Sequence, residues 1–156
     1  MSDGLSHIDE QGRARMVDVG QKTPSLRTAV ASGVVRMQAA TLAAITENRV
    51  AKGEVLAVAR VAGIMAAKRC GELIPLCHPL ALESVEVEFD VPELCPPDGE
   101  AVELVIRATA KLTGKTGVEM EALTAVSVAG LTVYDMCKAI DKTMTIDAVR
   151  LVSKTK

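Results

Sequence analysis

The sequence predicts an α+β fold in which helices pack on one face of an antiparallel sheet. Segment 81–91 alternates apolar and acidic residues, as a half-exposed strand does, whereas segments 52–69 and 118–140 have helical spacing. The predicted elements follow one another in the order β-α-α-β-β-α-β, which suits a compact sheet with crossover helices. We expect a single domain over residues 1–156, with residues 1–15 flexible.

The first part of the chain predicts one strand followed by two helices. Segment 27–37 is rich in β-branched residues and partly alternates, which favours a strand. Segment 38–48 is Ala-rich with helical spacing and ends at Asn48. Segment 52–69 is a helix that is apolar almost all round. Such a helix is buried on most sides, so we expect it to lie at a subunit interface.

The middle of the chain predicts a stiff loop and a hairpin. LIPLCHPL at 73–80 contains two prolines, which restrict themselves and the residues before them to extended conformations. The strand at 81–91 is followed by a turn, CPPDG at 95–99, and then by a second strand at 101–112. The two strands are expected to pair in antiparallel fashion.

The last part of the chain predicts a long helix and a closing strand at 143–154. The helix, at 118–140, carries a polar stripe. At about 100° per residue, the following polar residues share an arc of roughly 120°: Glu121, Thr124, Ser127, Asp135 and Lys138. A solvated face is the simple explanation, but Val128 and Leu131 lie in the same arc and favour a pocket wall. Asp135 and Lys138 are i, i+3 neighbours that could pair, and burial would ease deprotonation of Lys138.

The composition limits the ligands that the chain can bind. Its 156 residues include one Phe, one Tyr and no Trp, too few rings for the stacking platforms of single-stranded nucleic-acid modules. The 18 Lys and Arg against 20 Asp and Glu give a net charge of −2, so we expect no nucleic-acid partner. Any anion must meet a local cluster of cations. The 22 Ala and 20 Val each bury little area, which favours oligomerisation to complete the core.

The sequence predicts a cytoplasmic protein with reduced thiols and no membrane partner. The first fifteen residues lack the apolar stretch of a signal peptide, and the longest uncharged helical stretch, 122–134, is shorter than the roughly 18 residues of a membrane span. The four cysteines, Cys70, Cys77, Cys95 and Cys137, show no C-x-x-C spacing. They therefore support neither a zinc site nor a redox motif.

The loop at 73–80 holds the first candidate for chemistry, the pair Cys77–His78. A lone histidine is commonly a structural hydrogen-bonding residue, whereas a histidine fixed between prolines is placed as general acid–base catalysis requires. Both interpretations remain open on the local sequence. Metal binding by the pair is disfavoured, because adjacent side chains diverge and no other ligand pair has suitable spacing.

Segment 113–123, TGKTGVEMEAL, is a candidate anion site. It is not an ATPase P-loop, because Thr109 stands where the Walker pattern needs a glycine. A Gly-containing turn that opens a helix still offers backbone N–H groups to an anion, and Lys111 and Lys115 lie nearby. The alternative is a plain connection whose acidic residues complement the helix dipole.

Four motifs in the same order resemble the cyclic pyranopterin monophosphate synthases, the C-protein family of molybdenum-cofactor biosynthesis. They are MVDVG at 16–20, KGEVLAVARVAGIMAAKR at 52–69, LIPLCHPL at 73–80 and TGKTGVEMEALTAVSVAGLTVYDMCKAID at 113–141. The resemblance covers about residues 7–154. It implies a ferredoxin-like subunit in a homohexamer, a trimer of dimers, with sites at the dimer interfaces.

The resemblance also implies the reaction. A radical enzyme makes 3′,8-cyclo-7,8-dihydroguanosine 5′-triphosphate, and this family converts it to cyclic pyranopterin monophosphate and pyrophosphate. Ring opening and closure need proton transfers but no redox step, so no cofactor is implied. Mg²⁺ is a candidate companion of the triphosphate, and hand-over of substrate from the radical enzyme is a candidate interaction.

Individual residues receive roles from the resemblance. The implied catalytic acids and bases are Asp135, Lys138, Lys52 and His78. The implied substrate-binding residues are Leu76, Cys77, His78, Met120 and Glu121, with Arg27, Lys22 and Lys154 near the triphosphate. Family members typically continue past the last strand with a Gly- and Lys-containing tail, whereas this sequence stops at SKTK, 153–156. If such a tail closes over the phosphates in the family, substrate affinity here rests on Lys154 and Lys156 or differs from that of other members.

Two other functions are weighed against the lyase. A non-catalytic purine-nucleotide-binding regulatory protein of the same fold would share the nucleotide-binding motifs. A structural ring-forming protein would account only for the apolar helix at 52–69. The presence of every matched acid or base position favours the lyase.

Overall fold

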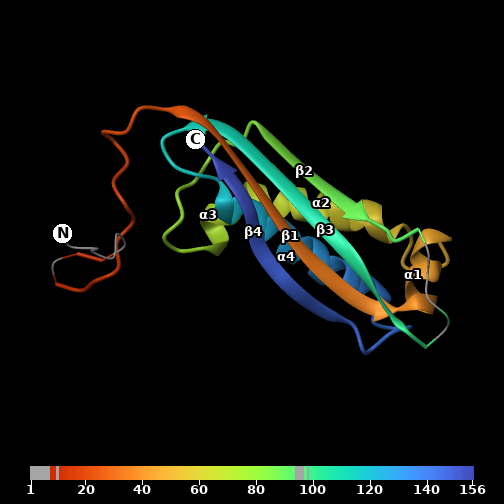
Figure 1. Cartoon of the computed structure of the whole chain (residues 1–156). Helices are drawn as coiled ribbons and strands as arrows, with labels where there is room; N and C mark the ends of the chain where they lie inside the picture. Colours follow the sequence, from red (N-terminus) through yellow and green to blue (C-terminus); the bar gives the residue numbers. More distant parts are fainter. Residues whose placement is uncertain (1–7, 10, 94–96, 98) are drawn as a thin grey trace.

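The computed structural model describes residues 8–9, 11–93, 97 and 99–156, and its centre is a four-stranded antiparallel sheet (Figure 1). The strands are β1 (Ser25–Gln38), β2 (Ser84–Asp90), β3 (Ala101–Gly114) and β4 (Thr145–Thr155), and the helices are α1 (Ala39–Thr46), α2 (Val55–Lys68), α3 (Cys70–Leu73) and α4 (Glu119–Cys137). The sheet order is β2-β3-β1-β4, and all neighbours are antiparallel. The predicted α+β, ferredoxin-like class is confirmed.

The long central strands β1 and β3 pair from Ser25↔Gly114 to Gln38↔Ala101 and carry the sheet's buried face. Alternate residues of β3 point into the core: Val102, Leu104, Ile106, Ala108, Ala110 and Leu112. Strand β2 pairs with β3 as the hairpin prediction requires, and Val87 is its buried residue, while its acidic residues are exposed. The predicted turn at 95–99 lies largely outside the described residues, as do residues 1–7 and 10 of the leader.

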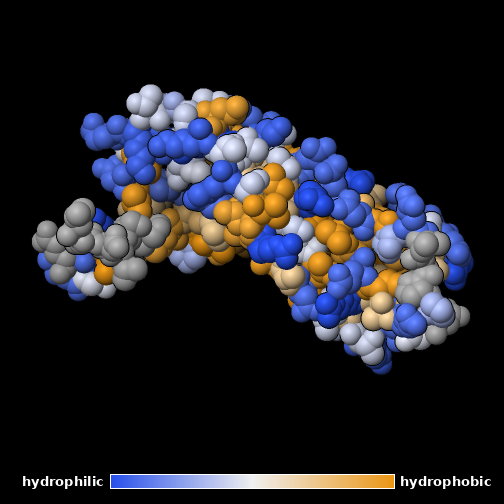
Figure 2. All heavy atoms as spheres, in the orientation of Figure 1, coloured by the Kyte–Doolittle hydropathy of each residue, from blue (hydrophilic) through white to orange (hydrophobic). Residues whose placement is uncertain are grey.

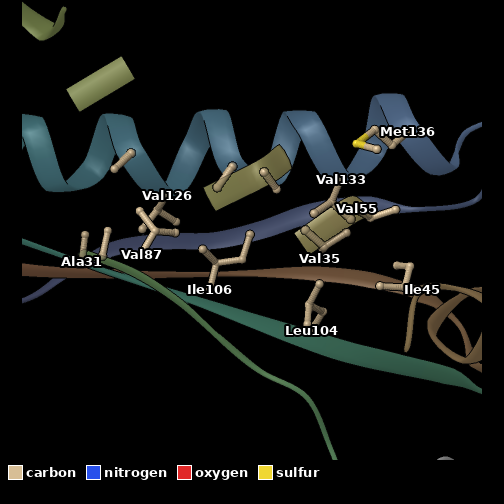
Figure 3. Packing of buried hydrophobic residues seen from close by; sticks show 14 of the residues in the cluster. Ala31, Val35, Ile45, Val55, Val87, Leu104, Ile106, Val126, Val133 and Met136 are labelled. Atoms are coloured by element: carbon tan, nitrogen blue, oxygen red, sulfur yellow. The ribbon is translucent and has the colours of Figure 1, made fainter. Parts of the chain in front are cut away.

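Helices α2 and α4 cover one face of the sheet (Figure 1). Figure 3 shows Val126 and Val133 of α4 meeting Val35 and Ile106 of the strands in one apolar layer. Close approach depends on small residues, as the composition predicts. A Cβ atom at Gly63 of α2 would lie only 2.9 Å from the carbonyl oxygen of a residue of α4.

The helices differ from the prediction in two details. The long helix ends at Cys137 rather than 140, and a short helix, α3, precedes the proline-rich loop. Within one chain α4 and β2 cover only part of α2, so the expected burial of this helix at a subunit interface stays a prediction. Val58, Val61 and Met65 remain 46%, 56% and 48% exposed. Within the described residues, no helix is both long and apolar enough to cross a membrane.

Candidate active site

A pocket of about 560 Å³ opens where the proline-rich loop, the start of α4 and the N-terminal segment come together. It is lined by Val17, Val19, Lys22, Ile74, Leu76, Cys77, His78, Leu80, Thr116, Gly117, Glu119, Met120 and Glu121. The structure thus brings together Leu76, Cys77, His78, Met120 and Glu121, the residues other than the cations that the resemblance assigns to substrate binding. It adds Val17 and Val19, whose only sequence signal is their place in the MVDVG motif.

The pocket holds two groups whose pKa values burial raises. Glu121 is only 3% exposed, and burial raises the pKa of its carboxyl. Burial also raises the pKa of the Cys77 thiol to about 11, with a further contribution from the neighbouring Cys70. A thiol with so high a pKa is not a nucleophile at neutral pH. Cys77 is therefore suited to shaping the pocket and contacting a ligand, not to covalent catalysis.

The prolines of the loop place His78 against the N-terminal segment. Its Nε2 atom lies 2.8 Å from the carbonyl oxygen of Val17, and the ring also lines the pocket. The structural and the functional interpretations of this histidine are therefore not alternatives, since one ring has both a structural partner and access to the pocket.

A second cavity adjoins the first and is rich in cations. Lys22, Thr116, Gly117 and Glu119 line both cavities, so the two are continuous around the start of α4. The second cavity is also lined by Arg27, Lys115 and Lys156. The start of α4 has no side-chain cap, so its backbone N–H groups add to the positive potential there.

Lys154 reaches the same region through an ion pair. Its Nζ atom lies 3.2 Å from Oε1 of Glu119, which sits beside Gly117 at the start of α4. The basic residues assigned to the triphosphate, Lys22, Arg27 and Lys154, therefore lie around one helix end. Lys115, which belongs to the candidate anion segment at 113–123, also lines the second cavity.

Asp135, Lys52 and Lys138 form a separate cluster at the far end of α4. The Oδ2 and Oδ1 atoms of Asp135 lie 2.8 Å from Nζ of Lys52 and 2.6 Å from Nζ of Lys138. Hydrogen bonds and charge attraction from Lys138 and Lys52 lower the pKa of Asp135 to about 2. The predicted i, i+3 pairing is confirmed, whereas the contact with Lys52 spans 83 residues of sequence.

The expectation that burial eases deprotonation of Lys138 is wrong for the single chain. Lys138 is exposed, and its hydrogen bond and attraction to Asp135 raise its pKa. The polar stripe of α4 is also not one pocket wall. Glu121 and Thr124 are buried, whereas Leu131, Asp135 and Lys138 are exposed.

The two clusters cannot meet within one chain. Glu121 and Asp135 are 14 positions apart on the same helix, which at a rise of about 1.5 Å per residue separates them by roughly 21 Å. Among the described residues, no group of three or more His, Cys, Asp or Glu side chains could hold a metal ion.

The fold and the site are those of an enzyme that acts on a small molecule, with a pocket beside a cation-lined cavity and a cluster of acidic and basic groups on the same helix. Comparison with known proteins gives the family: the chain belongs to the MoaC family, whose model matches residues 16–156. The curated relatives include proteins named cyclic pyranopterin monophosphate synthase. One from Chloroflexus aggregans is 62% identical over 97% of this chain and 88% of its own length. Others, from Desulfitobacterium hafniense and Rhodospirillum rubrum, are each 58% identical over 97% and 99% of this chain, and 88% and 89% of their own lengths.

Proposed function

We propose that this protein is the lyase that converts 3′,8-cyclo-7,8-dihydroguanosine 5′-triphosphate to cyclic pyranopterin monophosphate and pyrophosphate in molybdenum-cofactor biosynthesis. The observation that carries the proposal is that a largely apolar pocket is continuous with a cavity lined by cations. The first offers Leu76, Met120 and Glu121 to a ring, and the second offers cations to a chain of phosphates. The relatives named as synthases of this product support the same assignment.

Substrate binding follows from the chemistry of each cavity. Leu76 and Met120 supply aliphatic surface for the guanine-derived ring, while Glu121 and His78 can hydrogen-bond its polar edge. Arg27 and Lys22 face the phosphates. Closure of the cyclic phosphate expels pyrophosphate, and these cations stabilise the charge that develops on it.

Catalysis in this proposal is proton transfer by Asp135, Lys138 and Lys52. The carboxylate of Asp135 lies between two ammonium groups. When the substrate takes the place of one ammonium group beside the carboxylate, protons can pass between the substrate and this cluster. Because the reaction changes no oxidation state, we propose that it needs no resident cofactor. Mg²⁺, if the reaction uses it, would enter with the triphosphate.

The distance between the clusters supports a dimeric site. We propose that Lys52, Asp135 and Lys138 of one subunit complete the pocket of its partner, within a hexamer built as a trimer of dimers. The exposed apolar residues of α2, and Leu131 of α4, offer surface for such interfaces. Figure 2 shows further apolar patches on the molecular surface. Association of this kind would complete a core made largely of small side chains.

A cytoplasmic location and a functional link to the upstream enzyme belong to the same proposal. Cys70, Cys77 and Cys137 are all free thiols, as a reducing compartment allows. The substrate is made by a radical enzyme, so direct hand-over from that enzyme would complete the sequence of steps.

The test is turnover of the cyclic intermediate. Purified protein is mixed with 3′,8-cyclo-7,8-dihydroguanosine 5′-triphosphate, and the pterin product and pyrophosphate are quantified together. We expect one pyrophosphate per pyranopterin formed, and product formation slowed by roughly 10²-fold or more in the Lys138→Ala variant. Binding of the intermediate without product would refute the lyase and leave a nucleotide-binding protein.

A further inference from the structure

Residues 16–22 form an ordered segment along the edge of the pocket, held by contacts at two points. His78 Nε2 lies 2.8 Å from the carbonyl oxygen of Val17, and Lys115 Nζ lies 2.7 Å from that of Gly20. The segment also has its own turn, in which the backbone N–H of Lys22 donates to the carbonyl of Val19 at 3.0 Å. Because Val17 and Val19 line the pocket, the segment is part of its wall.

The partner of His78 determines which ring nitrogen carries the proton. A peptide carbonyl accepts hydrogen bonds and cannot donate them, so Nε2 of His78 must be the protonated nitrogen. In a neutral imidazole, Nδ1 is then unprotonated and is the nitrogen that can accept a proton. The carbonyl of Val17 therefore selects one of the two tautomers and fixes the plane of the ring.

We propose that residues 16–22 are a positioning element: through the carbonyl of Val17 they hold His78 as the Nε2–H tautomer and leave Nδ1 as its proton acceptor. The proposal rests on the proposed function, which gives His78 its role toward the substrate. Lys115 ties the same segment at the cation-lined cavity. The segment therefore links the ring pocket to the phosphate cavity, and its order governs the geometry of both.

Two full-length variants separate the hydrogen bond from the rest of the ring. In His78→Gln, the side-chain amide nitrogen takes the place of Nε2 and can still donate to Val17. In His78→Asn, a polar atom takes the place of Nδ1, but nothing reaches the carbonyl. Hydrogen–deuterium exchange of residues 16–22, followed by mass spectrometry, reports on the order of the segment.

The expected result is a difference between the two variants. His78→Gln keeps the exchange rate of the parent protein, whereas His78→Asn raises it roughly 2- to 10-fold, as loss of one such hydrogen bond would. Lys115→Met should also raise the rate, while the matched control Lys111→Met, four residues earlier in β3, should not. Equal exchange in the Gln and Asn variants, whether both protected or both open, would overturn the proposal.

The tautomer is measured directly by ¹⁵N NMR of the imidazole nitrogens, with His7→Gln removing the signals of the other histidine. At about pH 9, where imidazoles are ordinarily neutral, Nε2 should be protonated and Nδ1 not. A predominant Nδ1–H form would refute the positioning role. Neither measurement involves turnover, so a protein that fails as a lyase and a segment that fails to position His78 give distinguishable results.

Discussion

Asp135 lies between two ammonium groups, and this arrangement determines what the residue can do. With its pKa lowered to about 2, the carboxyl is ionised throughout the physiological range. It therefore acts as a proton acceptor or as an anchor for the two lysines, and not as a proton donor at the start of the reaction.

The first prediction concerns this cluster. Asp135→Asn removes the charge that holds Lys52 and Lys138, and Lys138→Ala removes one of the two ammonium groups. We expect each variant to lower kcat by roughly 10²-fold or more, the usual contribution of a positioned acid or base. Steady-state assays of product formation measure this loss. Asp90→Asn, which breaks an exposed pair with Arg107 on the sheet, is the control and should keep full activity and the same oligomeric state.

Asp141, three residues after Lys138, has a structural role. Its side chain is 1% exposed and accepts hydrogen bonds from the backbone N–H of Gln38 at 2.9 Å, from the hydroxyl of Thr41 at 3.1 Å and from Thr143. Burial alone would raise the pKa of this carboxyl, but the hydrogen bonds outweigh it, and the pKa is lowered. Asp141 thereby fastens the end of α4 to the junction of β1 and α1.

The second prediction is that Asp141→Ala lowers the free energy of unfolding by about 2–4 kcal/mol, because buried donors lose their acceptor. Since the folded-state pKa is lowered, the contribution of Asp141 is present above about pH 4, the ordinary range of an Asp. It is lost as the pH falls through the lower folded-state pKa. Urea denaturation at several pH values measures this. The exposed Asp147→Ala should change stability by less than about 0.5 kcal/mol, and an equal loss in both variants would contradict the argument.

At the level of single residues, the sequence predicts contacts that are local and misses those that are not. The pairing of Asp135 with Lys138 follows from helical spacing alone. The contact of Lys52 with Asp135 depends on how two distant segments pack, so it was reached only through the resemblance. The expected ease of deprotonation of Lys138 failed because it assumed burial that the single chain does not provide.

Among the elements, the contact between α2 and α4 sets the spacing of the two helices within their layer. Gly63 faces Ala125 and Ala129 of α4, and a Cβ atom there would lie 2.9 Å from the carbonyl oxygen of Ala125. Backbone cannot move aside as the end of a flexible side chain can. The spacing of the two helices therefore depends on the absence of a side chain at this position.

The third prediction follows from that spacing. Gly63→Ala favours the helix by its intrinsic propensity, by about 0.5–1 kcal/mol, but the overpacking against α4 costs about 1–3 kcal/mol. We expect a net loss of stability of about 1–2 kcal/mol, measured as a lower urea midpoint with an unchanged m-value. Lys68→Ala, in the exposed last turn of α2, is the control and should lie within about 0.5 kcal/mol of the parent. A more stable Gly63→Ala protein would contradict the tight contact.

The helices and strands are largely predictable from the sequence, and the errors in predicting them have physical causes. Alternation in β2 and helical spacing in α4 act over many residues, so both elements are found with errors of a few residues at their ends. Helix α3 has four residues, too few for a periodic signal, and it follows α2 after a single residue. The apolar surface of α2 is wider than one chain covers, so its predicted burial depends on a second subunit.

Considered as a whole, the molecule holds the pocket and the Lys52–Asp135–Lys138 cluster, the two halves of the proposed site, at opposite ends of one helix. The sequence places Glu121 and Asp135 on one arc, but a projection down the helix axis hides the roughly 21 Å between them. A compact substrate that touches both clusters must therefore touch two chains. In a two-fold dimer, each interface would contain two such sites, each formed by the pocket of one subunit and the Lys52–Asp135–Lys138 cluster of the other.

The fourth prediction tests this arrangement by mixing two inactive variants. Glu121→Gln impairs the pocket and leaves the lysine cluster intact, whereas Lys138→Ala does the reverse. After the two chains are unfolded together and refolded in equal amounts, random pairing makes about one site in four fully wild-type. We expect activity to recover to about a quarter of that of the parent protein, whereas each variant refolded alone stays inactive.

A mixture of Glu121→Gln with Glu121→Gln/Lys138→Ala is the control and should recover nothing, since no chain in it has an intact pocket. If the first mixture also stays inactive, although mass spectrometry shows mixed oligomers, both clusters must serve the site from the same chain.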